Sequence, residues 1–287
     1  MTSDALRSPL RRRLGGFLLL AGGLGAGLAP AMSLASVDGE LDVPYVQTPD
    51  SVVGAMLDLA AIQSGEYVID LGAGDGRLLI EAARRGAEGF GVDIDPRLVE
   101  LANRNAKAAG VGERARFLVQ DLFETDLSRA NVLTVYLLPA VNAKLLPTVL
   151  ALEPGTRIVS HDYGFGDWQP DRKVTVEAPN KPVNAIKTSD LLLFFVPERV
   201  AGRWQGEGQE PWSLELAQDF QFVKGHLSVG GQRLPITEGK LEGRQLMLRA
   251  GSGESTVTLN ATVTGDTLEG KAQRQGNTLD WQGRRLP

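Results

Sequence analysis

Apolar residues between about positions 49 and 196 recur at two alternating spacings. Short runs that are mostly apolar, such as Tyr67–Leu71, are followed by longer segments whose apolar residues recur at helical spacing, such as Leu78–Arg85. Strand-length runs that alternate with helix-length segments are typical of βαβ units. The pattern therefore predicts an α/β domain in which helices cover a parallel sheet.

The boundaries of the expected elements follow from where each spacing begins and ends. The expected strands of the parallel part are Tyr67–Leu71, Phe90–Asp93, Arg116–Val119, Val132–Tyr136 and Arg157–Ser160. The expected helices are one that opens at Pro49 and runs to about Ala60, then Leu78–Arg85, Pro96–Ala109 and Ala140–Leu150. Beyond Asp162 the helical spacing disappears, and Lys173–Glu177 and Leu191–Val196 are predicted to close the sheet as an antiparallel edge pair.

The pattern changes again from Arg203 onward. Apolar residues now alternate with polar ones, as in Leu214/Leu216 and Leu246/Leu248, and glycine-rich turns interrupt them at short intervals. This is typical of a small antiparallel barrel or sandwich. We therefore expect an α/β domain over residues 49–198 and a small antiparallel all-β domain over residues 199–287.

The N-terminal segment has the layout of a targeting signal. Arginines at positions 7 and 11–13 precede an apolar, glycine-rich run from Leu14 to Met32, and small residues follow. Residues 1–35 are predicted to be a secretory signal of a kind resembling the twin-arginine type, which implies export to the periplasm. The alternatives are a retained anchor with transient membrane contact, which the glycines disfavour, or a cytoplasmic chain. Residues 36–48 are expected to form a linker and a lid over a cofactor.

Composition narrows the possible chemistry. With a net charge of -5, the chain has no excess of basic residues for contacting nucleic-acid phosphates, so no nucleic acid partner is expected. The absence of cysteine excludes disulfides, thiolate nucleophiles and zinc-thiolate sites. With two histidines, His161 and His226, a histidine-rich metal site is not expected either.

A glycine-rich turn follows the first expected strand. Gly72, Gly74 and Gly76 lie between that strand and a helix, where a glycine backbone can approach a ligand closely. Asp93 ends the second strand about twenty residues later, where a carboxylate can accept both ribose hydroxyls. Asp121 follows the third strand and can accept from an adenine amine, with Leu122 or Phe123 beside the ring.

The charges near this turn distinguish two nucleoside cofactors. The pyrophosphate of a dinucleotide would lie beside Asp70 and Asp75, and like charges repel in a partly desolvated site. The sulfonium and ammonium of S-adenosylmethionine are instead stabilised by carboxylates, so this cofactor is favoured over a nicotinamide. Asp93 or Asp121 alone could simply cap a helix or lie in a solvated loop. Their joint occurrence at successive strand ends points to a cofactor site.

Four segments resemble the class I S-adenosylmethionine-dependent methyltransferases. They are Tyr45–Pro49, Asp70–Arg77, Tyr136–Pro139 and Pro154–His161, and the resemblance spans roughly residues 45–196. It is closest to a subgroup that includes the ATP-synthase c-subunit lysine methyltransferases and bacterial relatives of unassigned substrate. The resemblance implies a Rossmann-like seven-stranded sheet with a reversed last strand and helices on both faces. It also implies cofactor contacts at Asp70, Gly72, Gly74, Asp93 and Asp121, and a lid formed by Tyr45 and Thr48 over the methionine moiety.

One departure concerns the methyl acceptor. Tyr136-Leu137-Leu138-Pro139 stands where many amino methyltransferases have an Asn/Asp-Pro-Pro-aromatic motif, which argues against a planar amide or base as the acceptor. The acceptor is therefore expected to be a protein or a small molecule, with lysine as a hypothesis. A non-catalytic binding protein that retained the fold and an NAD-dependent oxidoreductase are the competing functions.

Methyl transfer is an in-line displacement that depends mainly on aligning the nucleophile, the methyl group and the sulfur. This alignment can lower the activation free energy by about 7 to 11 kcal/mol. A base is needed only when the acceptor must first lose a proton, as a lysine ammonium must.

Tyr136 is the candidate for lining the acceptor channel, where its ring face favours a cation, or else it packs on the following helix. His161, beside Asp162, either orients or deprotonates the acceptor or is a hydrogen-bonded structural histidine. Tyr163–Trp168 is either a substrate-gating loop or a tight surface turn.

Overall fold

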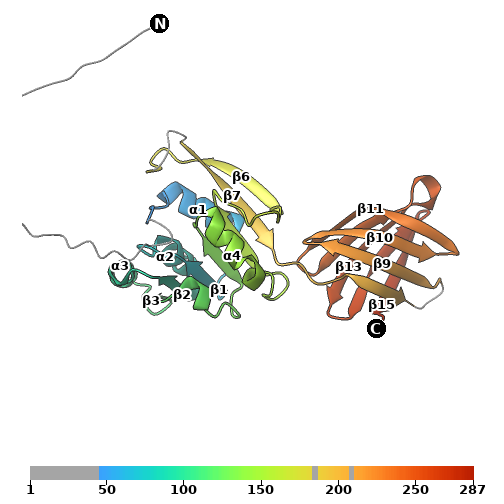
Figure 1. Ribbon diagram of the computed structural model, residues 1–287, viewed down its shortest axis with the longest axis horizontal. Helices are drawn as coiled ribbons and strands as arrows, with labels where there is room; N and C mark the ends of the chain where they lie inside the picture. Colours follow the sequence, from blue (N-terminus) through green and yellow to red (C-terminus); the bar gives the residue numbers. More distant parts are fainter. Residues whose placement is uncertain (1–44, 183–186, 207–209) are drawn as a thin grey trace, which may run out of the picture. The chain divides into compact units, whose positions relative to one another are not determined.

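The α/β part of the chain is built on one mixed sheet (Figure 1). The structure is a computed structural model that describes residues 45–182, 187–206 and 210–287, so the expected signal or anchor of residues 1–35 lies outside the described residues. Seven strands pair in the order β3-β2-β1-β4-β5-β7-β6. They are β1 (Tyr67–Leu71), β2 (Glu88–Asp93), β3 (Ala115–Val119), β4 (Val132–Val135), β5 (Arg157–His161), β6 (Arg172–Glu177) and β7 (Thr188–Phe195). The first five are parallel, and β7 runs antiparallel to both β5 and β6, which confirms the predicted sheet with its reversed last strand.

Helices cover both faces of this sheet because successive strand residues point to opposite sides. Val68 packs with the apolar side chains of α1 (Asp50–Leu59), α2 (Arg77–Arg84) and α3 (Pro96–Ala108). Ile69 and Leu71 pack on the other face with those of α4 (Pro139–Val149). None of the helices in the described ranges is both long and apolar enough to cross a membrane.

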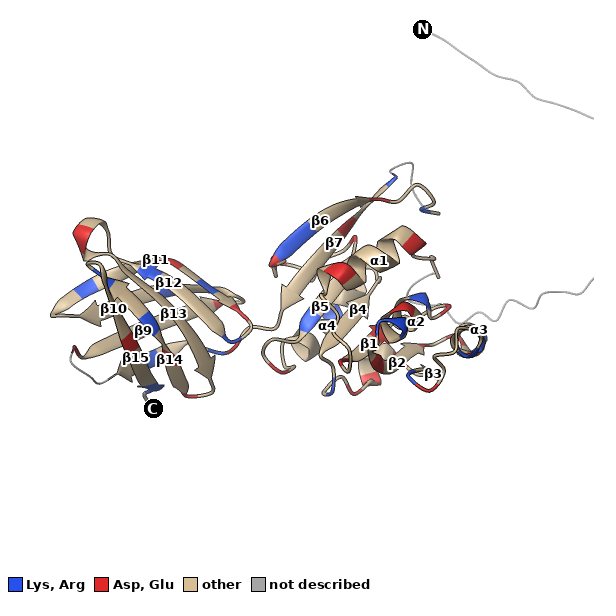
Figure 2. Cartoon of the chain, turned by 180° about the vertical axis from the view of Figure 1, so that it is seen from behind, with Lys and Arg blue, Asp and Glu red and all other residues tan. Residues whose placement is uncertain are grey.

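The edge strand β6 is charged and exposed. Figure 2 shows basic residues on it, in blue. Lys173 pairs with Asp190 of β7 at 2.7 Å, and five of the six residues of β6 are exposed. Charged side chains on an edge strand oppose pairing with another sheet, so the sheet ends here.

Residues beyond Gly202 form a closed eight-stranded antiparallel barrel. Its strands are β8 (Gly202–Gly206), β9 (Trp212–Asp219), β10 (Phe222–Val229), β11 (Gln232–Glu242), β12 (Gln245–Ala250), β13 (Val257–Thr264), β14 (Thr267–Arg274) and β15 (Asn277–Arg285). The Trp212 ring stacks on Trp281 with centroids 4.7 Å apart, and Gly206 and Gly283 leave the space that Trp212 fills. Packed side chains therefore fill the interior, as is usual for a barrel of this size. The predicted all-β domain is confirmed, and of the two forms considered it is the barrel.

Candidate active site

The carboxyl ends of the central strands bring the expected site residues to one edge of the sheet. Leu71 of β1 pairs with Val92 of β2 and with Val135 of β4, and Val135 pairs in turn with Ser160 of β5. The residues that come next along each strand are therefore neighbours. The glycine turn, Asp93, Tyr136 and His161 thus line one edge, although they are far apart in sequence.

The turn after β1 is held by backbone hydrogen bonds and needs its glycines. The N–H groups of Gly72 and Ala73 both donate to the carbonyl of Val92 at 2.9 Å. Gly74 has a φ of 55°, and a Cβ there would lie 2.4 Å from the Tyr45 ring. Only glycine accommodates both conditions. The Tyr45 ring thus lies directly over the turn, where the family resemblance implies a lid.

Asp70 is a buried carboxylate at the base of this turn. It is 2% exposed; one of its oxygens accepts the hydroxyl of Thr134 at 2.6 Å, and the other has no hydrogen-bond partner in the described part of the chain. Burial raises the pKa of Asp70 to about 7, the Thr134 hydrogen bond opposes this rise, and the charges of Asp93 and Asp75 add to it. A cation bound nearby would relieve this unfavourable burial of negative charge.

Asp93 and Asp121 each hold a backbone segment in place. One oxygen of Asp93 accepts the N–H of Gly74 at 2.9 Å, and the other accepts the N–H of Asp95 at 3.0 Å. Asp121 accepts the N–H of Phe123 at 2.8 Å and so caps a short 3-10 helix, Leu122–Glu124. Helix capping was the alternative interpretation of Asp121, and the structure shows that it performs this role. Leu122 is partly buried beside it against the core on the α4 side.

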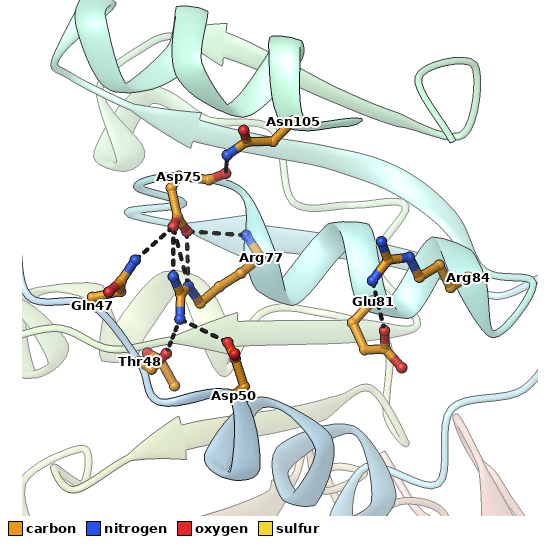
Figure 3. Close-up of polar contacts among 8 residues, drawn as sticks. All are labelled: Gln47, Thr48, Asp50, Asp75, Arg77, Glu81, Arg84 and Asn105. Carbon is orange, nitrogen blue, oxygen red and sulfur yellow. Dashed lines mark hydrogen bonds and ion pairs between the residues drawn. The ribbon is translucent and has the colours of Figure 1, made fainter. Parts of the chain in front are cut away.

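Asp75 is surrounded by hydrogen-bond donors of the protein (Figure 3), and this distinguishes its environment from that of Asp70. Its carboxylate accepts from Arg77 Nη2 at 2.7 Å, Arg77 Nε at 3.0 Å and Gln47 Nε2 at 3.0 Å. Burial opposes ionisation of Asp75, but the hydrogen bonds from Arg77 and Gln47 outweigh it and lower its pKa. The charge of Asp75 is therefore compensated within the protein, and Asp70 and Asp93 remain to stabilise a cation. Gly76, the next residue, is the N-cap of α2 and has a φ of 84°.

Arg77 also ties the segment before α1 to the glycine turn. Its Nη1 donates to the Thr48 carbonyl at 2.6 Å and to Asp50 Oδ1 at 2.9 Å (Figure 3). Thr48 is 5% exposed, and its carbonyl makes the contact to Arg77. One guanidinium thus holds both Asp75 and residues 45–49, the strap that carries Tyr45. Because its partners lie up to 29 residues away, the sequence pattern does not reveal this role of Arg77.

His161 is buried between Tyr136 and β7. Its side chain is fully inaccessible, its Nε2 lies 2.8 Å from the Ser189 hydroxyl, and its ring centroid lies 3.8 Å from that of Tyr136. Burial lowers the pKa of His161 to about 4, although the charge of Asp162 opposes this shift. The ring is therefore neutral at pH 7 and a weak base. Its position suits it to orient Tyr136.

Asp162 is the charged group at the end of β5. It has a φ of 62°, which is strained for a residue other than glycine. Its Oδ2 accepts from Lys181 Nζ at 2.6 Å and from the Tyr136 hydroxyl at 3.4 Å, and its Oδ1 accepts the N–H of Asp190 at 3.1 Å. Burial and the charge of Asp162 both raise the pKa of Tyr136, which keeps its hydroxyl protonated. No sequence motif links Lys181 to Asp162, so the pattern along the chain does not identify this lysine.

The segment Tyr163–Trp168 is packed into the protein. Phe165 and Trp168 are at most 1% exposed, and the indole N–H of Trp168 donates to Gln221 at 3.0 Å. Phe165 and Trp168 pair as an isolated antiparallel bridge, and Gly166 and Asp167 between them are exposed. Of the two alternatives the structure shows the tight surface turn, which its two buried aromatic side chains anchor.

The residues at the strand edge fit the expected S-adenosylmethionine. The oxygen of Asp70 that has no hydrogen-bond partner among the described residues and the carboxylate of Asp93 supply negative charge beside a glycine-rich turn, and Tyr45 covers this turn. A cationic nucleoside satisfies the buried charge, whereas a pyrophosphate would add to it.

Comparisons with known proteins point to the same class. A family model described as the ANTKMT methyltransferase domain matches residues 70–172. A protein-lysine N-methyltransferase of Saccharolobus islandicus is 40% identical over 141 residues, which cover 48% of this chain and 88% of that protein. An adenine nucleotide translocase lysine N-methyltransferase of Mus musculus is 32% identical over 178 residues, which cover 58% of this chain and 77% of that protein.

Two further proteins are similar to this chain. An ATP-synthase c-subunit lysine N-methyltransferase of Xenopus laevis is 30% identical over 133 residues, which cover 46% of this chain and 58% of that protein. This chain therefore spans less than two thirds of the Xenopus laevis protein. A solved RNA methyltransferase from Salinibacter ruber, in complex with S-adenosyl-L-homocysteine, is 46% identical with a TM-score of 0.49, covering 54% of this chain and 96% of that one.

The buried charge of Asp70 predicts a pH dependence of cofactor binding. Because a cation favours ionised Asp70, whose pKa is raised to about 7, the affinity for S-adenosylmethionine should rise about tenfold between about pH 6 and pH 7.5. Titration calorimetry measures this directly. Asp70→Asn should flatten the profile, whereas Asp219→Asn, an exposed change on the barrel, should leave it intact. A flat wild-type profile would contradict the assignment.

The bridging role of Arg77 predicts a loss of cofactor affinity when its planar guanidinium is replaced. Arg77→Lys keeps the charge but cannot bind Asp75 and Thr48 together, so the dissociation constant for S-adenosylmethionine should rise about tenfold. Arg84→Lys on the same helix is the matched control, because Arg84 pairs only loosely with Glu81, at 3.6 Å. Equal affinities of the two variants would show that the strap does not depend on Arg77.

Proposed function

This chain belongs to the class I S-adenosylmethionine-dependent methyltransferase family, and we propose that it transfers the methyl group to the side-chain amine of a lysine in a protein. The observation that carries the proposal is the group of Asp162, Tyr136 and Lys181 at the strand edge, in which a carboxylate holds a lysine ammonium at 2.6 Å. The named methyltransferases of Saccharolobus islandicus and Mus musculus act on lysine. The pair shows that the strand edge stabilises a lysine ammonium through a carboxylate that also accepts an aromatic hydroxyl, which is the chemistry that an acceptor lysine requires.

The cofactor supplies a methyl group bonded to a cationic sulfur, so this chain's residues need mainly to bind, align and exclude water. Asp70 and Asp93 would hold the cofactor through charge and hydrogen bonding, and Tyr45 would cover it. Asp162 would orient the acceptor amine and take up its proton, which must leave before the nitrogen can attack. Tyr136 would place its ring face and hydroxyl beside the incoming cation, held in position by the neutral ring of His161.

The proposal predicts that Asp162 is required for turnover and not for cofactor binding. Asp162→Asn should lower kcat by about a hundredfold or more, as expected for loss of a positioned base, while the dissociation constant for S-adenosylmethionine stays within about twofold. Tyr136→Phe should reduce kcat less. The measurement is transfer of labelled methyl to protein fractions of a cell extract, followed by hydrolysis and chromatography of methylated lysines.

Other outcomes of this experiment point to other functions. Label found only in small molecules would overturn the protein acceptor, and label in other amino acids would overturn lysine. Cofactor binding without any turnover would indicate a protein that retained the fold without the reaction.

We also propose that the protein is exported. The support is the sequence of residues 1–35, whose arginines and apolar run match a twin-arginine type of signal, a route that carries folded proteins. Because S-adenosylmethionine is made inside the cell, export in the folded state with cofactor bound would reconcile location and activity. Fractionation of cells that express a C-terminally tagged chain should find a shortened product outside the cytoplasm, and replacement of Arg11 and Arg12 by Lys should retain it inside. A full-length cytoplasmic product would contradict the proposal.

A further inference from the structure

Lys181 is a buried lysine within the candidate active site. Its side chain is 6% exposed, and its ammonium donates to Asp162 Oδ2 at 2.6 Å and to the Thr188 carbonyl at 2.9 Å. Lysine is rarely buried unless it is paired, because burying its charge is costly. The ion pair with Asp162 offsets that cost and holds the amine at the end of β5.

The position of this amine relative to the glycine turn follows from the strand order. The turn follows β1, Tyr136 follows β4 and Asp162 follows β5, and these three strands are neighbours in the sheet. Adjacent strands are about 4.8 Å apart, so Asp162 leaves the sheet about two strand spacings from the cofactor turn. Tyr136 lies between them, and its hydroxyl shares Asp162 Oδ2 with Lys181. The amine of Lys181 thus lies in the position proposed for the acceptor.

We propose that Lys181 is itself a methylation site, and that this protein transfers a methyl group from S-adenosylmethionine to the Nζ of its own Lys181. The inference rests on the proposed lysine methyltransferase function and adds a specific internal acceptor. An amine already positioned in the site requires no encounter between two molecules, which favours this transfer over one to a free lysine side chain.

The transfer balances without any further reactant. The ammonium of Lys181 first releases one proton to the Asp162 carboxylate, which passes it to solvent. The nitrogen lone pair then forms a bond to the methyl carbon, and the carbon–sulfur bond breaks with its electron pair remaining on sulfur. The products are methyl-Lys181, S-adenosylhomocysteine and one proton. The methylated amine keeps its charge, so the ion pair with Asp162 can re-form with one donor fewer.

The test is peptide mass spectrometry of the purified full chain after incubation with S-adenosylmethionine. We expect the peptide that contains Lys181 to gain one or more methyl groups, at a rate per molecule that does not change with protein concentration. Lys181→Arg keeps the charge and should abolish this methylation. Lys187→Arg is the matched control, because Lys187 is exposed and its Nζ contacts Lys181 at the backbone carbonyl, at 3.3 Å. The change keeps a donor there and should leave the methylation of Lys181 unchanged.

The same incubations with poly-L-lysine as an external acceptor separate the two proposals. Methylation of poly-L-lysine while Lys181 stays unmodified would overturn the internal site and leave the lysine methyltransferase function standing. Absence of both reactions, with cofactor bound, would overturn both. A methyl group on Lys187 in place of Lys181, or a rate that rises with protein concentration, would also overturn an internal acceptor at Lys181. Cofactor affinity of Lys181→Arg equal to that of the wild type would show that the variant is folded.

Discussion

The site depends on a negative charge that the protein buries and does not compensate. Asp70 lies beneath the glycine turn with one oxygen bonded to Thr134 and the other without a hydrogen-bond partner among the described residues. Burying a carboxylate in this way is unfavourable, and the raised pKa of Asp70 expresses that cost. A bound cation removes the cost, so the fold is arranged to prefer a positively charged ligand before any ligand arrives.

The other carboxylates around this edge divide into distinct roles according to their partners. Asp75 is only five residues from Asp70, yet Arg77 compensates its charge and turns it into an anchor for the strap that carries Tyr45. Asp162 is paired with Lys181. In the proposed function the same chemical group therefore attracts the cofactor, fastens the lid or orients the amine. The difference comes from which cation lies beside it.

The architecture was predictable because it follows from local periodicity. The strand Tyr67–Leu71 was predicted with the bounds that the structure has, and β7 runs antiparallel as expected. The convergence of Asp93, Tyr136 and His161 was also predictable, since the carboxyl ends of parallel strands meet at one edge. The choice between barrel and sandwich was not, because it depends on whether β15 pairs with β8, and those strands are distant in sequence.

The sequence by itself determined the sheet, the glycine turn and the class of cofactor, because each depends on short-range spacing and on the sign of nearby charges. Only the tertiary structure decided that Arg77 compensates Asp75, that His161 is buried and neutral, and that Lys181 reaches Asp162. Each of these depends on contacts between separate elements or on the burial that those contacts create. No local pattern encodes them, since the energy of a charge depends on what surrounds it in three dimensions.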